Sequence, residues 1–488
     1  MKGSLLALFS FTLGVATSSA ASFGVAGHSS QPAFPVYQSL SAAQQLDKVK
    51  ELGVTYYRVD ATDVWEIKAL VDAVRAPGSP YANIKIIPII YSWFTTDDLK
   101  TNPNGYSNSY FYNTCKQRGK DFASWWINSG YGMPFEAIEI GNEMDLICIK
   151  DGEDGKDLTD YHDEGGFQAN TIQGSYWRCQ AVIDGLADGI RQAHPTVKRL
   201  IGCAGWYHYG FIDKLLIDCG NANWEGVVYH WYSEMGLISQ QPAVTSKLQS
   251  YGKPVWITEV NNRNGSLQLP GETVAQAEQR QADGLGAQVN DLKTLSFVTA
   301  IFPYELFDEP NLASQAPNES RYGFYRIGGS PGSYYISGRK DVVFNAFQAA
   351  KAPGLGGGNY RLSNRWTGYF MHIENLTGKV QYGAIAAGAW SSHWTLVKNG
   401  EGYYTIQSRW TGAYLHIENQ LGYVQYDPYM SGAWSAQWSF VKNSDGYYTI
   451  VNRWTGAKMH TENQLGYVQY GSIPDNYSSV QWALTAAP

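Results

Sequence analysis

The sequence predicts an α/β fold, a (β/α)8 TIM barrel, followed by an all-β trefoil domain. Two observations lead to this prediction. Residues 21–350 alternate apolar strand-like runs with amphipathic helical stretches, whereas residues 359–488 contain one pattern three times at a constant spacing. Between the two parts lies a glycine-rich stretch, residues 351–358, whose composition is typical of a flexible linker.

The first part contains eight short apolar runs, separated by longer stretches with helical periodicity such as 42–52 and 274–292. The runs are 23–26, 55–59, 84–90, 137–140, 199–202, 226–229, 255–258 and 297–302. Eight such alternations within about 330 residues are typical of a closed parallel barrel. A doubly wound open sheet is the alternative, but no glycine-rich phosphate-binding loop follows the first run.

The second part repeats itself three times. An Arg-Trp-Thr-Gly motif begins at Arg365, Arg409 and Arg453, so successive copies are 44 residues apart. Other residues follow the same period: His372, His416 and His460; Glu374, Glu418 and Glu462; Trp394, Trp438 and Trp482. One such unit cannot bury an apolar face alone, but three units around a pseudo-threefold axis can. The repeat predicts a β-trefoil, with a three-bladed propeller as the alternative.

The first 20 residues have the layout of a secretory signal peptide. Lys2 gives a positive start, residues 5–15 are apolar, and small residues follow up to Ala21. This segment is too short to span a bilayer, and no later run offers about 18 unbroken apolar residues. We therefore expect a secreted, extracellular protein.

Composition excludes some classes of partner and favours another. A net charge of −7 argues against nucleic acid and against an anionic membrane, which both require a basic face. The 17 Trp and 35 Tyr residues favour carbohydrate, because the flat C–H faces of sugars stack on aromatic rings. Five cysteines fit an oxidising compartment with up to two disulfides: Cys115, Cys148, Cys179, Cys203 and Cys219. Four sequons predict a glycoprotein: Asn264, Asn318, Asn375 and Asn476.

Two glutamates follow predicted barrel strands. Glu143 comes after the fourth run, in Gly141-Asn142-Glu143, and Glu259 comes directly after the seventh. Reactive groups of such barrels lie at the C-terminal ends of the strands. Strands 4 and 7 face each other, so these carboxyl groups can lie about 5–5.5 Å apart, the separation for cleavage of a glycosidic bond with retention. We predict Glu143 as acid/base and Glu259 as nucleophile; the alternative is that each glutamate only caps a strand or pairs with a base.

These motifs resemble clan A of the glycoside hydrolases, over about residues 22–350. The resemblance implies that Asn142 binds the sugar 2-hydroxyl and that Arg58, at the end of the second run, holds the nucleophile ionised. The segment from His230 to Tyr232 is similar to the His-x-Tyr pattern of family 5-like members, in which the tyrosine contacts the nucleophile. We therefore expect both residues at the substrate site.

The chain departs from family 5 at strand 8. No tryptophan stands where that family places its sugar platform; the sequence has Tyr304 and Glu305 instead. We predict Tyr304 as a substitute platform and expect Glu305 to bond a hydroxyl. Trp93, after the third run, is a further predicted platform.

The trefoil repeats predict shallow sugar sites. Each repeat offers a tryptophan and a glutamate at equivalent positions: Trp366 with Glu374, Trp410 with Glu418, and Trp454 with Glu462. The alternative is that these three tryptophans are core residues. We expect Trp394, Trp438 and Trp482 to be core residues. The domain is similar to trefoil carbohydrate-binding modules, closest to those of β-1,3- and β-1,6-glucanases, because it lacks the Gln-x-Trp spacing of ricin-type lectins. Three weak sites on one body favour a repetitive polymer.

The combined prediction is a retaining, endo-acting hydrolase of a β-linked polysaccharide, first of all 1,3- or 1,6-linked glucan. The alternatives are a β-galactanase, a xylanase, an exo-β-glycosidase of the same clan, or a non-catalytic lectin-like protein. Two carboxylates and water suffice for the chemistry, so we expect no cofactor and no metal. We expect a monomer.

Overall fold

The computed structural model describes residues 21–61, 63–162, 175–220, 223–351, 359–399, 403–428, 430, 432–443 and 445–487. The chain divides into two compact units, with the boundary between Ala352 and Pro353. The predicted signal peptide and positions 352–358 of the predicted linker lie outside the described residues.

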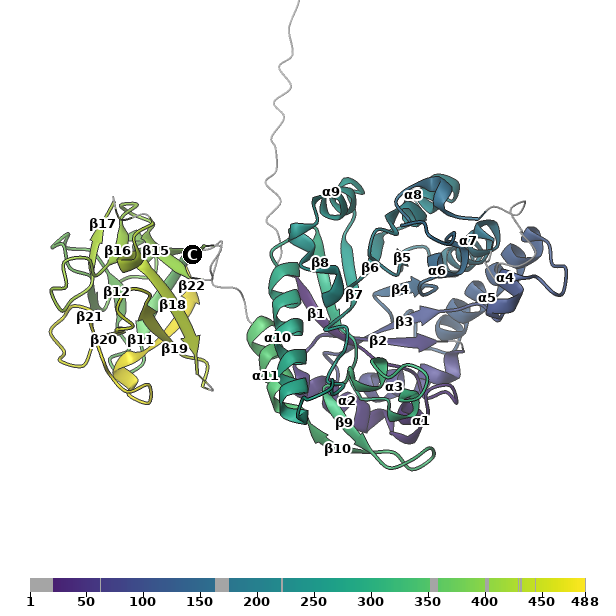
Figure 1. Cartoon of the computed structure of the whole chain (residues 1–488), viewed down its shortest axis with the longest axis horizontal. Coiled ribbons are helices and arrows are strands. Elements are labelled where there is room, and N and C mark those ends of the chain that lie inside the picture. The colour runs from purple at the N-terminus through teal and green to yellow at the C-terminus, as the bar shows by residue number, and fades with distance from the viewer. Residues whose placement is uncertain are drawn as a thin grey trace, which may run out of the picture. The chain divides into compact units, whose positions relative to one another are not determined.

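The first unit is a closed barrel of eight parallel strands, which confirms the predicted (β/α)8 fold (Figure 1). The strands are β1 (Ser22–Ala26), β2 (Tyr56–Ala61), β3 (Lys85–Ile90), β4 (Ala137–Ile140), β5 (Lys198–Cys203), β6 (Gly226–Tyr232), β7 (Val255–Asn261) and β8 (Val298–Pro303). They pair in chain order, and β1 closes the barrel against β8, with Ser22 opposite Ala300. Every predicted run forms a strand.

Helices surround this barrel (Figure 1). They are α1 (Pro35–Ser39), α2 (Ala42–Leu52), α3 (Val64–Arg75), α4 (Thr96–Lys100), α5 (Asn108–Asn128), α6 (Asp145–Cys148), α7 (Tyr176–Ala193), α8 (Tyr209–Asp218), α9 (Pro242–Ser250), α10 (Val274–Leu292) and α11 (Asp341–Lys351). Ser41, Asp63 and Thr273 begin α2, α3 and α10 with capping boxes, which satisfy the first free N–H groups. Within the described residues, no helix has both the length and the apolar character that crossing a bilayer requires.

The barrel interior changes character along its axis. Apolar side chains fill the end where the strands begin: Tyr56, Ile87, Ala137, Leu200, Val228, Trp256, Ala300 and Phe302. Strand β1 contributes Gly24 here, because a Cβ at that position would lie 2.3 Å from the Phe302 ring. Side chains two residues further along a strand point the same way. Arg58, Glu139 and His230 therefore also point inward, towards the C-terminal ends of the strands.

Helices α5 and α7 cross closely because glycines lie at the contact. A Cβ on Gly189 would lie 2.0 Å from the carbonyl oxygen of Lys116, and one on Gly119 would lie 2.2 Å from that of Leu186. Any side chain there would push the helices apart. The contact fixes α5, which follows β3 in the chain.

A hairpin of β9 (Tyr325–Gly328) and β10 (Tyr335–Arg339) follows the barrel strands.

The second unit is all-β, and the predicted trefoil fold is confirmed. Its strands are β11 (Asn359–Asn364), β12 (Phe370–His372), β13 (Gln381–Gly383), β14 (Trp394–Lys398), β15 (Tyr404–Ser408), β16 (Tyr414–His416), β17 (Gln425–Asp427), β18 (Gln437–Lys442), β19 (Tyr448–Asn452), β20 (Lys458–His460), β21 (Gln469–Gly471) and β22 (Gln481–Ala486). The last strand pairs with the first, with Leu484 opposite Leu362.

Three tryptophans form the centre of the trefoil core, as expected. Trp394, Trp438 and Trp482 are fully buried, one from each repeat. Each indole Nε1 donates a hydrogen bond to a main-chain oxygen 23 positions earlier, at 3.2, 3.0 and 3.1 Å respectively. The threefold pattern of the sequence is thus a threefold pattern of packing, in which each tryptophan is bonded to an earlier strand of its own repeat.

The expected disulfides are absent. All five cysteines lie in the described part of the chain, and each is a buried free thiol. Burial raises the pKa of Cys115 and of Cys219 to about 12, which keeps both thiols protonated. Cysteine here behaves as a small apolar residue that fills the packing between helices and barrel.

Candidate active site

Glu259 is held by two partners from separate strands of the barrel. Its Oε1 accepts a hydrogen bond from Nη1 of Arg58 at 2.9 Å, and its Oε2 accepts one from the Tyr232 hydroxyl at 2.7 Å. Arg58 lies on β2 and Tyr232 on β6, and all three side chains are buried. Both carboxylate oxygens are therefore fixed, which orients the group in the barrel mouth.

A β-bulge turns Glu259 towards the interior. Val228 on β6 pairs with Trp256 on β7, but His230 pairs with Glu259, so β7 contains one extra residue between the two pairs. Simple alternation from the inward-pointing Trp256 would put Thr258 inside and Glu259 outside. The extra residue reverses this, as bulges next to active sites do.

Glu143 is connected to Glu259 through His230. The distance between Nδ1 of His230 and Oε1 of Glu143 is 2.8 Å, and the distance from that nitrogen to Oε2 of Glu259 is 3.5 Å. Burial opposes the charged form of His230, but the negative charges of Glu259 and Glu143 outweigh it and raise the histidine pKa. The imidazole between the two carboxyl groups therefore keeps its proton to a higher pH than a free histidine does.

The two carboxyl groups are close. One oxygen of Glu143, one of Glu259 and a ring nitrogen of His230 all lie within 4.8 Å of one another. The chain reaches this position by a sharp turn after β4, with positive φ angles of 71° at Gly141 and 47° at Glu143. A non-glycine residue rarely adopts such an angle, and residues that do so cluster at functional sites.

Arg58 also joins residues of β4. Its Nη2 donates to Oδ1 of Asn142 at 2.9 Å, and its Nε and Nη2 donate to the carboxylate of Glu139 at 2.7 and 2.6 Å. The sequence analysis missed Glu139. The signal for it was a charged residue in the middle of a four-residue apolar strand, where only a buried partner can compensate the charge.

A second buried network lies beside the first. Nδ1 of His28 is 2.5 Å from Oδ2 of Asp60, and its Nε2 is 3.1 Å from the Tyr304 hydroxyl and 3.5 Å from Oε2 of Glu305. Burial opposes the charge on His28, but Asp60 and Glu309 outweigh it and hold the histidine pKa well above its usual value. Burial and the nearby Glu309 raise the pKa of Glu305 well above its usual value.

This network contains both residues predicted at strand 8. Tyr304 lies at the edge of the site, where its ring also packs against Tyr322 at a centroid distance of 5.8 Å. Glu305, in contrast, is fully buried, and its Oε2 accepts a hydrogen bond from the Tyr37 hydroxyl at 3.0 Å. The expectation that Glu305 bonds a sugar hydroxyl stays a prediction: the side chain is buried, and its Oε1 has no hydrogen-bond partner among the described residues.

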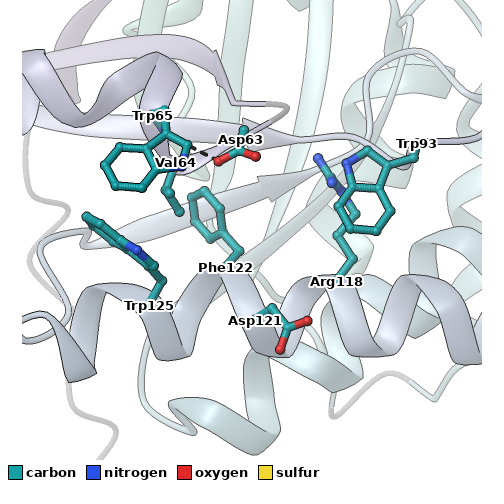
Figure 2. Close-up of a pocket in the computed structure, with 8 residues that line it drawn as sticks. All are labelled: Asp63, Val64, Trp65, Trp93, Arg118, Asp121, Phe122 and Trp125. Atoms are coloured by element: carbon teal, nitrogen blue, oxygen red, sulfur yellow. Dashed lines mark hydrogen bonds between the residues drawn. The ribbon is translucent and has the colours of Figure 1, made fainter.

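Trp93 lies apart from the two glutamates. Its ring is 62% exposed and packs against the guanidinium of Arg118, on α5, at 4.3 Å. Together with Trp65 and Trp125 it lines a groove (Figure 2). The other predicted barrel residues, Arg58, Asn142, Glu143, His230, Tyr232 and Glu259, form one connected network.

Trp206 is a further candidate that the sequence analysis missed. It follows β5 with a positive φ of 54°, and its ring is 41% exposed. Its carbonyl oxygen accepts a hydrogen bond from the Tyr229 hydroxyl at 2.6 Å. The preceding Gly205 leaves no room for a side chain, since a Cβ there would lie 1.9 Å from the His230 oxygen. The main chain at Trp206 is therefore fixed beside β6, the strand whose His230 contacts Glu143.

The trefoil glutamates are anchored in the same way in all three repeats. Glu374, Glu418 and Glu462 accept hydrogen bonds from Ser391, Ser435 and Ser479 respectively. In the first two repeats an exposed tryptophan precedes that serine and packs against an arginine, Trp390 on Arg409 at 4.5 Å and Trp434 on Arg453 at 4.2 Å. The third repeat has Ser478 at this position.

The motif tryptophans of the trefoil are surface residues. Trp366, Trp410 and Trp454 are 45%, 45% and 44% exposed, so their rings are accessible to a ligand. The near-identical exposure follows from the threefold repeat.

Two groups of side chains within the described residues could hold a divalent cation. They are Glu143 with His230 and Glu259, and His28 with Glu305 and Glu309; in each group the donor atoms lie within 4.8 Å of one another. In the first group, the hydrogen bonds to His230, Arg58 and Tyr232 described above already occupy Oε1 of Glu143 and both oxygens of Glu259.

Two family models match the chain. Residues 176–321 match the glycosyl hydrolase catalytic core, and residues 390–470 match the ricin-type beta-trefoil lectin domain-like family. The sequence lacks the Gln-x-Trp spacing, from which we predicted a difference from ricin-type lectins. The match to the ricin-type family model shows that this spacing does not distinguish the trefoil from that family. None of the proteins with curated functions matches the sequence.

Several solved structures are similar to parts of the chain. A GlcNAcα1-4Gal-releasing endo-β-galactosidase from Clostridium perfringens is 40% identical over 27% of this chain and 32% of its own, with a TM-score of 0.26. The designed threefold-symmetric protein ThreeFoil is 30% identical over 26% of this chain and 98% of its own, with a TM-score of 0.24. An exo-β-1,3-galactanase from Clostridium thermocellum is 24% identical over 26% of this chain and 30% of its own, with a TM-score of 0.23.

These likenesses cover about a quarter of the chain each, and the chain spans about a third of the endo-β-galactosidase. The barrel unit contains a match to a glycosyl hydrolase catalytic core, and the second unit contains a match to a ricin-type β-trefoil lectin domain.

Proposed function

We propose that the protein is a secreted, retaining glycoside hydrolase that cuts within a β-linked polysaccharide, with Glu143 as acid/base and Glu259 as nucleophile. One observation supports retention above all: carboxylate oxygens of the two glutamates lie within 4.8 Å of each other. Retaining enzymes hold their carboxyl groups about 5–5.5 Å apart, whereas inverting enzymes need about 6.5–9.5 Å to admit a water molecule.

In the first step, a carboxylate oxygen of Glu259 attacks the anomeric carbon and forms a glycosyl ester. The glycosidic C–O bond breaks, its electron pair stays on the leaving oxygen, and that oxygen takes the proton of Glu143. Arg58 and Tyr232 orient the nucleophile through the hydrogen bonds to its two oxygens. The departing sugar lies on the Glu143 side, where Trp206 offers an exposed ring.

In the second step, the Glu143 carboxylate takes a proton from water. The resulting hydroxide oxygen attacks the anomeric carbon, the ester bond breaks, and Glu259 leaves as a carboxylate, so the product keeps its anomeric configuration. His230 contacts Oε1 of Glu143 and stabilises the carboxylate between the two steps.

The substrate we propose is a 1,3- or 1,6-linked β-glucan, held by the trefoil during successive cuts. Exposed tryptophans recur at equivalent positions of the repeats, which suits a polymer with repeating units. The N-terminal 20 residues support export, because they have the charged, apolar and small-residue regions of a signal peptide.

The test combines variants with product analysis. Glu259→Gln should abolish turnover on every substrate. Glu143→Gln should lose polysaccharide hydrolysis but keep cleavage of an aryl glycoside, whose leaving group needs no proton. The exposed Glu153→Gln is the matched control. NMR of the first product should show the β-anomer from a β-glucan.

A panel of glucans, galactans and xylans identifies the linkage that is cut. An α-anomer as first product, or full activity of the Glu259 variant, would contradict the mechanism. Binding without cleavage of any polymer would favour the lectin-like alternative. Products of one size released only from chain ends would favour an exo-acting enzyme.

A further inference from the structure

A groove of about 170 Å³ lies over helices α3 and α5, outside the network of Glu143 and Glu259 (Figure 2). We call it the aromatic groove. It is lined mainly by Asp63, Trp65, Trp93, Arg118, Asp121 and Trp125. The described residues of the catalytic network contribute nothing to its lining.

Two indole rings stand open in the aromatic groove. Trp65 is 64% exposed and Trp93 is 62% exposed. Large apolar rings exposed on one surface are typical of a ligand-binding site, and these two stand at opposite ends of the same groove (Figure 2). Neither ring is needed for the core of the barrel.

Both rings are fixed before any ligand arrives. The guanidinium of Arg118 covers one face of Trp93, and Nε of the same arginine donates to the Tyr91 oxygen at 2.5 Å. Trp65 meets Trp125 edge to face, with centroids 5.1 Å apart and planes at 72°. Because fixed rings lose little conformational entropy on binding, even a ligand with weak contacts, such as a sugar, can bind there.

Polar groups stand beside the rings. In Figure 2 the carboxylates of Asp63 and Asp121 lie on either side of Phe122, which forms the floor. Carboxylate oxygens accept several hydrogen bonds, and sugar hydroxyls donate them. Flat apolar faces bordered by acceptors are complementary to a pyranose ring, which has C–H faces and an equatorial rim of hydroxyls.

The aromatic groove is built from segments that follow β2 and β3, at the same end of the barrel as the catalytic network. Asp63 and Trp65 follow β2, and Trp93 follows β3, so they extend from the strand ends that carry the catalytic network. The wall between the two sites is a chain of hydrogen bonds, from Arg118 to Tyr91 and from the Tyr91 hydroxyl to Asp60 at 2.6 Å.

We propose that the aromatic groove binds one or two sugar units of the substrate polysaccharide, beyond the units held by the catalytic network. This proposal rests on the proposed function for the identity of the polymer. The volume is below the about 300–1,000 Å³ of a drug-sized site, which suits a short stretch of sugar. A protein partner would need about 1,000 Å² or more of contact, far more than the groove offers.

The direct test uses 19F NMR of full-length Glu259→Gln protein labelled with fluorotryptophan. Trp65→Phe and Trp93→Phe variants assign the two signals by their loss. We expect both signals to shift, saturably, on titration with soluble oligosaccharides of the polymer that the enzyme cuts. The proposal would be overturned if the Trp65 and Trp93 signals did not move at a sugar concentration that saturates the shifts of the other tryptophan signals. Shifts that depend on protein concentration alone would also overturn it.

A kinetic test uses the active enzyme. Trp65→Ala combined with Trp93→Ala should lower kcat/KM on the polymer about three- to tenfold and leave kcat/KM on a short oligosaccharide unchanged. Tyr335→Ala, which removes an exposed ring on the β9–β10 hairpin, is the matched control. An equal loss on both substrates would refute a binding role. Absence of hydrolysis in the unmutated protein would instead reject the proposed function.

Discussion

Arg58 and Glu139 form a bidentate ion pair inside the barrel, with Nε–Oε2 and Nη2–Oε1 distances of 2.7 and 2.6 Å. Both side chains are almost fully buried. The same arginine positions Glu259, so the pair supports the active site from β2 and β4.

Replacement of Glu139 by alanine should leave the Arg58 charge buried and partly uncompensated. We expect unfolding free energy to fall by about 3–5 kcal/mol and activity to fall with it. Urea denaturation followed by fluorescence measures the loss. The control is Glu136→Gln, because the pairs of Glu136 with Lys85 and Lys198 are half-exposed and worth about 1 kcal/mol or less. Equal losses would contradict the role of the buried pair.

Stability should decline as the pH rises from mildly acidic values. His28 keeps its proton in the folded state above 6.5, and Glu305 keeps its proton above 4.5, because both pKa values are raised. At His28 and Glu305 the folded state thus binds more protons than the unfolded state, so the contribution of His28 is complete below pH 6.5 and is lost as the pH passes its folded pKa. The protonated Glu305 also stabilises the folded state at low pH, and this contribution declines as the pH rises from 4.5 to the folded pKa of Glu305.

Melting temperatures from pH 4.5 to 8 measure this decline. His28→Gln should flatten the curve, since the variant has no group that takes up this proton. His194→Gln, at the end of α7, should keep the slope of the unmutated protein. A melting temperature that rises steadily over this range would contradict the expectation.

Trp206→Ala should separate two classes of substrate. We expect kcat/KM on the polysaccharide to fall about tenfold or more, because the leaving sugar loses its platform. Cleavage of an aryl glycoside should stay within about twofold, since the aryl group needs no such platform. Initial rates on both substrates, with Trp206→Phe as the conservative control, test this. A parallel loss on both would instead indicate damage to the strained turn at Gly205 and Trp206.

The trefoil offers two tryptophans four residues apart with opposite expected effects. Trp438→Ala removes a fully buried ring and should destabilise the domain by about 3–5 kcal/mol. Trp434→Ala removes an exposed ring over Arg453 and should change stability by about 0.5 kcal/mol or less. The second variant should instead weaken pull-down by insoluble β-glucan. Calorimetry and pull-down assays of both distinguish packing from binding.

Much of the fold was predictable from local pattern. Apolar runs separated by helical stretches indicated every barrel strand, and the 44-residue spacing indicated the trefoil. The candidate site was predictable in part: Glu143 and Glu259 follow strands 4 and 7, and Arg58, Asn142, His230 and Tyr232 lie with them. Glu139 carried a signal, as a charged residue within an apolar strand, but its partner Arg58 lies on another strand and could not be read from that stretch. Trp206 was not predicted, because the hydrogen bond that places its main chain comes from Tyr229 on another strand.

The cysteines show the same limit in another form. Their number and the predicted export suggested disulfides, yet all five are buried as free thiols. Count and compartment are properties of the sequence, whereas a disulfide needs two side chains brought together in a narrow range of distance and angle.

By itself the sequence determined which elements form and which carboxylates stand at strand ends, because strand and helix periods are properties of a few consecutive residues. The tertiary structure alone decided which way Glu259 points. Without the extra residue in β7, alternation would direct Thr258 into the barrel and Glu259 towards the helices. Register depends on how neighbouring strands pair, so the position of the proposed nucleophile is set by the closed barrel as a whole.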